Sequence, residues 1–287
     1  MKDITGEGCE VLVPFSERKP LEEIEKSIIK KYRKHIWSKF TKALKEYNLV
    51  EEGDKIAVAI SGGKDSMLMA KLFQELKKHN HQANFELEFI VMDPGYHPDI
   101  KKLLIDNCDY LNIPIKIFES GIFGIINDIA KDYPCFMCAK MRRGALYNKA
   151  QELGCNKLAL GHHFNDVIET TLLNILYTGN VKTMLPKLKS TNFEGLELIR
   201  PLYFMEETYI EKFTQNNGIW PLNCACMVAA KRTGNKRYEI KKLIEDLKIN
   251  IKDVDKSIFN AARNVNMDAI LGWKKDGEKH SYLDFYE

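Results

Sequence analysis

From residue 55 onward, short apolar segments alternate with longer amphipathic segments, and this alternation constrains the fold more than any other feature of the sequence. The apolar segments are IAVAI (56–60), LEFIVMD (87–93), IPIKIF (113–118) and KLALG (157–161), with LELI (196–199) as a fifth candidate. Helices are predicted to begin near Asp65, Pro98, Gly121, Cys138 and Asn165. Strands that alternate with helices in this way predict βαβ units with right-handed crossovers. The expected fold class is therefore α/β, with a doubly wound parallel sheet.

Length and composition agree with an ordinary globular protein. The chain has 287 residues, of which 45% are hydrophobic and 29% charged, and this excludes disordered and collagen-like classes. No uncharged apolar stretch approaches the ~18 residues of a membrane span, and the first residues lack the order of a signal peptide. We therefore expect a cytoplasmic protein with no membrane partner. A net charge of only +3 means that a nucleic-acid partner must be argued from where the charges lie.

One amphipathic helix is predicted over residues 21–48, ahead of the sheet. Its apolar side chains recur at helical spacing: Ile28, Ile29, Tyr32, Ile36, Phe40, Leu44 and Tyr47. Seven basic residues share the helix, and no acidic residue occurs from 26 to 45: Lys30, Lys31, Arg33, Lys34, Lys39, Lys42 and Lys45. A charged helix usually presents a solvated face, but this bias favours contact with a polyanion. Helices at 235–248 and 255–271 are expected to cap the sheet.

The segment Ser61-Gly62-Gly63-Lys64-Asp65-Ser66 directly follows the first predicted strand and opens a helix. Paired glycines let the backbone curl around phosphate oxygens, and the helix N-terminus presents unpaired N–H groups. Lys64 adds a full positive charge, so the segment predicts an anion cradle rather than a generic glycine turn. Because Asp follows Lys64, the Walker A spacing is absent and ordinary P-loop NTPase chemistry is disfavoured.

Other polar motifs also follow predicted strands, at the edge where doubly wound sheets bind ligands. Asp93 ends the second strand, and Gly161-His162-His163 ends the fourth. For the two histidines, a purely structural role is the alternative to a role in the site, since neither belongs to an H-x-x-x-H pair.

The chain has an odd number of cysteines and is expected to lack an export signal. Both features disfavour a disulfide framework. The cysteines are at positions 9, 108, 135, 138, 155, 224 and 226. Cys9, Cys108 and Cys155 stand alone and are expected to be small buried apolar side chains. Cys135 and Cys138 form a C-x-x-C pair about one helical turn apart, and basic neighbours favour their thiolate forms.

Three kinds of cysteine site fit this pattern. A redox pair would need no distant partner. A structural zinc site would use Cys135, Cys138, Cys224 and Cys226, which is the correct ligand count. An iron–sulfur cluster held by Cys135, Cys138 and one downstream cysteine would leave one iron open to bind sulfur. The residues themselves leave zinc and the cluster open.

The loop SGGKDS resembles the PP-loop of the ATP pyrophosphatases, which split ATP between its α and β phosphates. The segment GHHFNDVIET (161–170) is similar to that family's second signature, G-H-x-x-D-D-x-x-E-T, with Asn165 in place of the first Asp. The resemblance implies a Rossmann-like PP-loop fold and the following nucleotide-binding residues: Ser61, Gly62, Gly63, Lys64, Asp65, Ser66, Met92, Asp93, Gly161 and His162. It implies catalytic roles for Lys64, Asp65 and Asp166, with Asp166 as the carboxylate for Mg²⁺.

The run PCFMCAKMRRGALYNKAQELGCNKLALGHHFNDVIETTLLNILYTGNVKTMLPKLKS through IRPLYFMEETYIEKF is very similar to tRNA 2-thiocytidine synthetases of the TtcA type. The likeness spans about residues 25–245. In those enzymes a C-x-x-C and a later cysteine ligate a [4Fe–4S] cluster, which implies that Cys135 and Cys138 are ligands. The family has C-x-x-C where this chain has Cys224-Ala225-Cys226. Cys226 is preferred as the third ligand because C-M-V-A resembles C-P-x-A in related thiolases, and Cys224 is the alternative.

This resemblance implies a reaction in which ATP adenylates the C2 oxygen of a tRNA base and sulfur then replaces that oxygen. It points to cytidine 32 of the anticodon loop, where a base can be splayed out at low cost. The implied partners are tRNA and a sulfur donor, such as a cysteine desulfurase or inorganic sulfide, and related enzymes are often homodimers. Besides the 21–48 helix, the expected phosphate contacts are Lys140, Arg142, Arg143, Lys231, Arg232, Lys236 and Arg237.

Two alternatives remain beside this hypothesis. One is a PP-loop ligase or thiolase that acts on another base or a small molecule and carries a structural zinc site. The other is an RNA-binding zinc protein without catalysis, which intact Lys64 and Asp65 disfavour. The expected organisation is an N-terminal extension (1–50), a PP-loop domain (51–227) and a C-terminal helical segment (228–287).

Overall fold

The computed structural model describes residues 16–79, 83–120, 134–222 and 236–286, with the backbone alone for residues 134–139. The chain divides into two compact units, each described here by itself. The first comprises Met1–Val167 and Leu185–Asn235, and the second comprises Ile168–Met184 and Lys236–Glu287. The domain boundaries at residues 50 and 227 stay a prediction.

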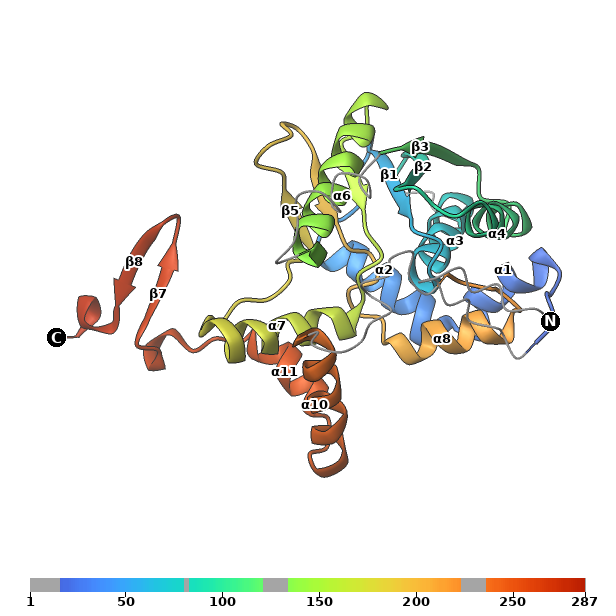
Figure 1. The fold of residues 1–287 in the computed structure, drawn as a ribbon. Coiled ribbons are helices and arrows are strands. Elements are labelled where there is room, and N and C mark those ends of the chain that lie inside the picture. Colours follow the sequence, from blue (N-terminus) through green and yellow to red (C-terminus); the bar gives the residue numbers. More distant parts are fainter. Residues whose placement is uncertain (1–15, 80–82, 121–133, 223–235, 287) are drawn as a thin grey trace. The chain divides into compact units, whose positions relative to one another are not determined.

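The first unit is built on a six-stranded sheet with the order β3-β2-β1-β4-β6-β5. Figure 1 labels β1, β2, β3 and β5 of this sheet. Its strands are β1 (Lys55–Ile60), β2 (Glu86–Asp93), β3 (Ile115–Glu119), β4 (Lys157–Ala159), β5 (Lys187–Lys189) and β6 (Glu197–Ile199). All neighbouring pairs are parallel except the edge strand β5, which pairs antiparallel with β6. The predicted α/β class and mostly parallel sheet are confirmed, including the fifth strand candidate, and β5 is an addition.

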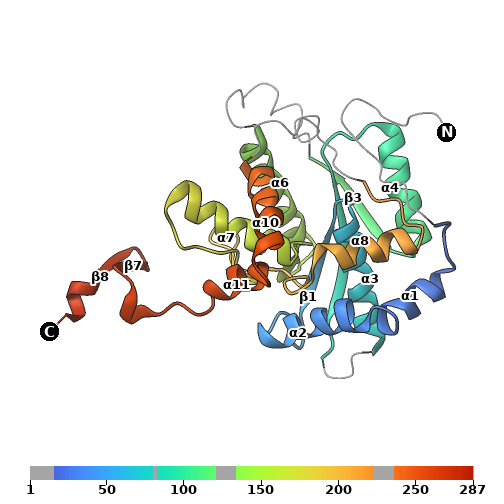
Figure 2. The ribbon, with the colours of Figure 1, turned by 90° about the horizontal axis from the view of Figure 1, so that it is seen from below.

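The direction of winding reverses between β1 and β4. Helices α3 (Lys64–His79) and α4 (Pro98–Tyr110) connect β1 to β2 and β2 to β3, and α6 (Pro134–Glu152) precedes β4 on the other side of β1. Right-handed crossovers therefore place α3 and α6 on opposite faces, as Figure 2 shows. In folds of this kind such a reversal forms the crevice at the carboxyl ends of the strands where ligands bind, which here is the edge of β1 and β4.

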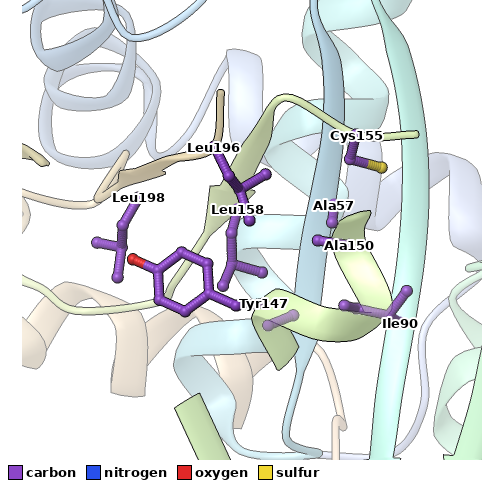
Figure 3. Close-up of a cluster of buried hydrophobic side chains, with 9 residues drawn as sticks. Ala57, Ile90, Tyr147, Ala150, Cys155, Leu158, Leu196 and Leu198 are labelled. Carbon is purple, nitrogen blue, oxygen red and sulfur yellow. The ribbon is translucent and has the colours of Figure 1, made fainter. Parts of the chain in front are cut away.

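Each face of the sheet carries its own apolar packing. Ten of the sixteen residues of α3 are buried, because this helix lies between the sheet and the helices α1 (Leu21–Ile29) and α8 (Glu207–Asn216). On the other face, Tyr147 and Ala150 of α6 pack with Leu158 and Leu198 of the sheet (Figure 3). Cys108 and Cys155 are buried and free, as expected for single cysteines. The pKa of each thiol is raised by burial, to about 12 and about 11 respectively.

The single helix predicted over residues 21–48 is wrong. The chain forms α1, then a π-helix η1 (Arg33–Trp37), then α2 (Ser38–Glu46). The buried side chains explain the interruption, because they recur strictly every four residues: Ile24, Ile28, Tyr32, Ile36, Phe40 and Leu44. In an α-helix each such step drifts by about 40° around the axis. The wider π turn corrects this drift and keeps the row facing the core.

The second unit contains most of α7 (Phe164–Thr178) and the C-terminal elements. These are α10 (Lys236–Asn250), α11 (Val254–Ala261), η2 (Met267–Ala269), β7 (Gly272–Lys275), β8 (Glu278–Ser281) and η3 (Tyr282–Phe285). Arg237 Nε donates to Glu169 Oε2 (2.9 Å) and ties α10 to α7. The helix predicted over 255–271 ends at Ala261, because a β-hairpin follows whose turn has Asp276 and Gly277 at positive φ.

Two further expectations have different outcomes. In the part of the chain that the structure describes, no helix is long and apolar enough to cross a membrane. The helix predicted to begin near Gly121 lies outside the described residues. The proposal that the C-terminal helices cap the sheet stays a prediction.

Candidate active site

The loop after β1 is shaped by its own side chains. Ser66 Oγ accepts a hydrogen bond from the backbone N–H of Ser61 (3.2 Å) and donates to the carbonyl of Gly63 (2.9 Å). Gly62 has φ +82°, and a Cβ there would lie 2.6 Å from Leu222 Cδ1. Glycine is therefore required both for the conformation and for the close approach. The first N–H groups of α3 are held at the open end of the sheet, where an anion binds well.

The second motif packs directly against the start of α3. Gly161 follows β4, and a Cβ on it would lie only 3.3 Å from Ser66 N and 3.4 Å from Asp65 Cβ. The absence of a side chain lets the two motifs meet across the crevice. The structure thus brings the predicted residues of 61–66 and 161–166 together at one edge.

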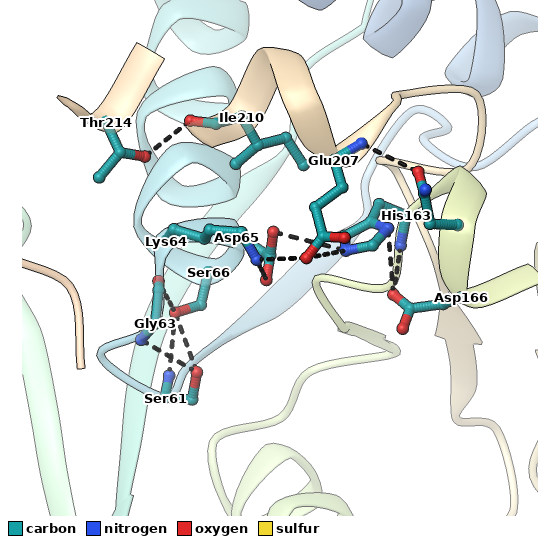
Figure 4. A network of polar contacts seen from close by, with 11 residues as sticks. Ser61, Gly63, Lys64, Asp65, Ser66, His163, Asp166, Glu207, Ile210 and Thr214 are labelled. Atoms are coloured by element: carbon teal, nitrogen blue, oxygen red, sulfur yellow. Dashed lines mark hydrogen bonds and ion pairs between the residues drawn. The ribbon is translucent and has the colours of Figure 1, made fainter. Parts of the chain in front are cut away.

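Charged side chains from three elements meet in this crevice (Figure 4). Lys64 Nζ lies 3.0 Å from Glu207 Oε1 and 3.3 Å from Asp65 Oδ2. The ring of His163 stands between the carboxylates: its Nε2 is 3.7 Å from Asp65 Oδ1 and 4.0 Å from Glu207 Oε1. Its Nδ1 is 3.5 Å from Asp166 Oδ2.

Burial and mutual charge shift the protonation of this cluster. Burial alone would lower the pKa of Lys64, but the carboxylates of Asp65 and Glu207 outweigh it and raise that pKa well above its usual range. Burial raises the pKa of Asp65, and the charges of Asp166 and Glu207 add to this effect against the opposing pull of Lys64 and His163. Lys64 is therefore a permanent cation here, beside a carboxyl that is costly to ionise. Phosphate oxygens complement such an arrangement.

The side chains of Asn165 and Asp166 accept hydrogen bonds from backbone N–H groups and thereby fix two members of the cluster. Asp166 Oδ2 accepts from the N–H of His163 (2.8 Å) and closes the first turn of α7. Asn165 Oδ1 accepts from the N–H of Glu207 (3.0 Å), so the residue that departs from the family's Asp orients the start of α8. Glu207 then supplies a carboxylate of its own to Lys64.

Within the described ranges, no group of three His, Cys, Asp or Glu side chains is placed to hold a metal ion. Mg²⁺ is commonly held by one or two carboxylates together with substrate phosphates, so the donor chemistry of Asp65 and Asp166 suits it. The catalytic and metal-binding roles of these residues stay predictions.

Met92 and Asp93 reach the same edge, one strand away. Ile60 pairs with Val91, so both residues extend past the end of β1. The Asp93 side chain accepts from the N–H groups of Gly95 (2.9 Å) and Tyr96 (2.8 Å) and pairs with Lys101. These bonds overcome the effect of burial and lower the pKa of Asp93. Its carboxylate thus shapes a turn, and the role of the backbone near Met92 and Asp93 in facing the nucleotide stays a prediction.

The cysteine-bearing segments begin at this edge as well. α6 ends just before β4 starts, so its first turn, which contains Cys135 and Cys138, points toward the carboxyl ends of the strands. Met141, one turn further on, packs against Met92. The N–H of Leu222 donates to the carbonyl of Gly62 (2.9 Å). Residues 223–235, which include Cys224 and Cys226, lie outside the described residues.

Two members of the cluster were not predicted from the sequence. The sequence pattern does not single out Glu207, although this residue stands in the segment IRPLYFMEETYIEKF that carries the family likeness. An acidic residue in the first turn of a helix was the available signal. His163 was given a structural interpretation as an alternative, but its ring lies among three carboxylates. Lys231 and Arg232, which are expected to contact phosphates, lie outside the described residues.

A glycine loop that opens a helix at the switch point of a parallel sheet, facing a G-H-H segment, defines a PP-loop domain. The family model described as a PP-loop domain matches residues 32–221.

Relatives and solved structures narrow this class. A tRNA-cytidine(32) 2-sulfurtransferase of Syntrophotalea carbinolica is 37% identical over 229 residues, covering 78% of this chain and 86% of the relative. The enzyme of the same name from Bdellovibrio bacteriovorus is 33% identical, covering 84% and 90%. The solved structure of the U34-tRNA thiolase NcsA from Methanococcus maripaludis with its [4Fe-4S] cluster has the same fold. Its TM-score is 0.63 at 24% identity, covering 88% of this chain and 82% of that one. The chain belongs to the PP-loop family of tRNA-cytidine(32) 2-sulfurtransferases.

Proposed function

We propose that this chain uses ATP to replace the C2 oxygen of cytidine 32 in tRNA with sulfur. The observation that carries the proposal is the convergence at one sheet edge of three parts of the chain. These are the loop 61–66, the turn of α6 that bears Cys135 and Cys138, and Leu222, which precedes Cys224 by two residues and Cys226 by four. An extended chain spans about 7 Å over two residues and about 14 Å over four, which limits the distance of either cysteine from Leu222.

The first half of the reaction is nucleotide activation. The C2 oxygen of the base attacks the α phosphorus of ATP, and pyrophosphate leaves. Lys64 and the N–H groups of the loop hold the phosphate oxygens, while Asp65 and Asp166 supply carboxylates for Mg²⁺. Glu207 and His163 fix the position of Lys64 and Asp65. In the second half, sulfide attacks C2, and AMP leaves with the original oxygen.

The sulfur chemistry is assigned to a [4Fe–4S] cluster, whose donor set the chain contains. Cys135 and Cys138 are three residues apart in the first turn of α6, which suits two thiolates of one centre. Cys226 is the third ligand in this proposal, with Cys224 as its alternative. When bound, such a cluster supplies an iron site for the incoming sulfur. The donor of that sulfur is a cysteine desulfurase or inorganic sulfide.

Recognition of tRNA is assigned to the basic residues of the N-terminal helices. Lys30, Lys31, Arg33 and Lys34 are exposed at the junction of α1 and η1. Their charges are available to phosphates because their apolar neighbours Ile28, Tyr32 and Ile36 anchor this segment. A homodimer belongs to the same proposal, and light scattering measures it.

The decisive experiment is a reaction with anaerobically purified protein, ATP, sulfide and a tRNA that carries cytidine 32. We expect 2-thiocytidine in the digested tRNA, together with AMP and pyrophosphate in equal amounts. Iron and labile sulfide should be present in the protein. The Cys135→Ala variant should lose thiolation and iron but keep ATP binding.

Matched controls separate the alternatives. Cys108→Ala removes a buried free cysteine that belongs to no proposed ligand set, and it should keep both iron and activity. A tRNA with uridine 32 should remain unmodified. Zinc in place of iron, or unchanged tRNA with a fully loaded protein, would refute the proposal.

A further inference from the structure

A buried arginine at the carboxyl edge has no role in the site described above. Arg200 directly follows β6 and is only 5% exposed. Its Nη1 donates to the carbonyl of Leu185, while its Nε is buried without a hydrogen-bond partner. Among the described residues, neither Arg200 nor Arg143 forms an ion pair with a carboxylate. Asp166 acts on Arg200 only from beyond ion-pair distance, and a buried cation without a directly paired anion is costly unless a ligand supplies one.

The packing of α6 on β6 brings Arg143 toward the same place. Tyr147 of α6 and Leu198 of β6 belong to one buried cluster (Figure 3). Arg143 precedes Tyr147 by four residues, which is about 6 Å along the helix on the same face. Arg200 follows Leu198 by two residues, which is about 6.6 Å along the strand. Because α6 runs opposite to the strands, both steps lead to the carboxyl edge.

The electrostatics agree with this placement. Burial, and next the charge of Arg143, lower the pKa of Arg200 to about 10. Burial raises the pKa of Tyr147, which both arginines oppose. Two like charges thus act on one phenol, with Arg143 exposed to solvent and Arg200 buried.

We propose that Arg143 and Arg200 together bind a phosphate of the tRNA backbone next to the nucleotide that is modified. This inference rests on the proposed function and extends it. Guanidinium groups present planar pairs of donors that match phosphate oxygens. Arg143 is exposed and Arg200 is buried, so Arg143 forms the outer part of the phosphate site and Arg200 the inner part.

The alternative source of the same chemistry is a phosphate of ATP. The strand order β1-β4-β6 sets Arg200 two strands from the loop 61–66, or about 10 Å along the edge. This spacing favours a second phosphate site that is separate from the pyrophosphate cradle. The spacing fits a tRNA nucleotide whose phosphate lies at Arg143 and Arg200 and whose base reaches toward the loop 61–66.

The test measures tRNA binding by the full chain as a function of salt, and ATP binding by calorimetry. Arg143→Gln alters an exposed side chain and should keep the fold. We expect its Kd for tRNA to rise about tenfold. The slope of log K against log salt should fall by about 0.7–0.9, and the Kd for ATP should not change. Lys149→Gln, on the same helix and paired with Glu152, is the control that should leave all three values unchanged.

A double-mutant cycle tests whether the two arginines share one phosphate. In the Arg200→Lys background, Arg143→Gln should weaken tRNA binding by less than about threefold. Additive effects would show two separate roles and overturn the shared site. An unchanged tRNA affinity in Arg143→Gln, or a weakened ATP affinity with an unchanged salt slope, would also overturn it. If the wild-type protein binds no tRNA, the proposed function itself fails.

Discussion

The two ends of strands β1 and β4 carry charged clusters of opposite character. At the amino end, Lys157 is 2% exposed and its Nζ donates to Asp54 Oδ2 (2.6 Å) and Glu51 Oε2 (2.8 Å). The second oxygen of Asp54 accepts from Asn156 (2.7 Å). At the carboxyl end, Asp65 Oδ1 and His163 Nδ1 are buried without hydrogen-bond partners.

This difference separates stability from function within one sheet. The amino-end cluster satisfies its own charges, so it needs nothing from outside and serves to hold the start of both strands. The carboxyl-end cluster leaves two buried polar atoms without hydrogen-bond partners, as is typical of a binding site whose ligand supplies the missing hydrogen bonds. Four predictions test this contrast.

The largest effect should follow the loss of a charge at the carboxyl end. Lys64→Met removes the cation that faces the phosphates, so thiolation should fall about 1,000-fold while tRNA affinity is kept. Single-turnover assays with labelled tRNA measure this loss. The matched variant Lys157→Met should retain activity within about threefold in its folded fraction. Equal losses of thiolation activity in Lys64→Met and Lys157→Met would contradict the assignment of function to the carboxyl end and of stability to the amino end.

A second prediction concerns the same pair of lysines and the free energy of unfolding. Lys157→Met leaves Asp54 as a buried charge without its partner, which should lower the free energy of unfolding by about 3–5 kcal/mol. Urea titrations followed by circular dichroism measure it. Lys187→Met, which removes a more exposed partner of Glu51, should cost less than about 1 kcal/mol.

The pH dependence of stability should have opposite signs at the two ends. Hydrogen bonds from Lys157 and Lys187 lower the pKa of Glu51, so its contribution is present above its unfolded pKa and is lost as the pH falls. Burial raises the pKa of Asp65, so ionising it costs stability as the pH rises from its unfolded pKa through its folded one. Glu51→Gln should therefore destabilise the protein near neutral pH, and Asp65→Asn should stabilise it.

Both of these effects should vanish toward low pH. Urea midpoints of the two variants and the wild type, measured from pH 4 to pH 7, follow the trend. The change for Glu51→Gln should stay below about 1 kcal/mol, because water screens this exposed side chain. A stabilised Glu51→Gln variant would contradict the assignment.

The smallest effect concerns the isolated cysteines. Burial raises the pKa of Cys108 to about 12 and that of Cys155 to about 11, so neither should be alkylated by iodoacetamide at pH 8 in the folded protein. Mass spectrometry of peptides after alkylation detects any reaction. Labelling of either thiol within minutes would show that the core opens readily on either side of β1.

The sequence predicted best those features that depend on neighbours along the chain. The strand, glycine loop and helix at 56–79 follow from local patterns, and so does the placement of Gly161 at the end of β4. The hairpin at 272–281 lies outside the predicted elements, although Asp276-Gly277 is a strong turn signal. The four-residue spacing over 21–48 predicts a continuous helix, but its drift accumulates over five steps and is corrected by the π-helix η1.

Features that depend on contacts between distant segments could not be predicted in this way. Asn165 departs from the family pattern, and only the fold shows that its carbonyl oxygen orients Glu207 on another helix. The approach of Leu222 to Gly62 joins residues 160 positions apart. Nothing in either segment indicates the other, because a backbone hydrogen bond leaves no mark on side-chain identity.

The bond between Leu222 and Gly62 also has a consequence for the order of events. Gly62 belongs to the loop that is expected to bind phosphate, and its carbonyl holds Leu222 at the start of the segment that leads to Cys224 and Cys226. In the proposed reaction, a shift of this glycine on nucleotide entry would act on Leu222 through that one hydrogen bond. Nucleotide activation and sulfur delivery would then be coupled, and a nucleotide that fits poorly would slow both.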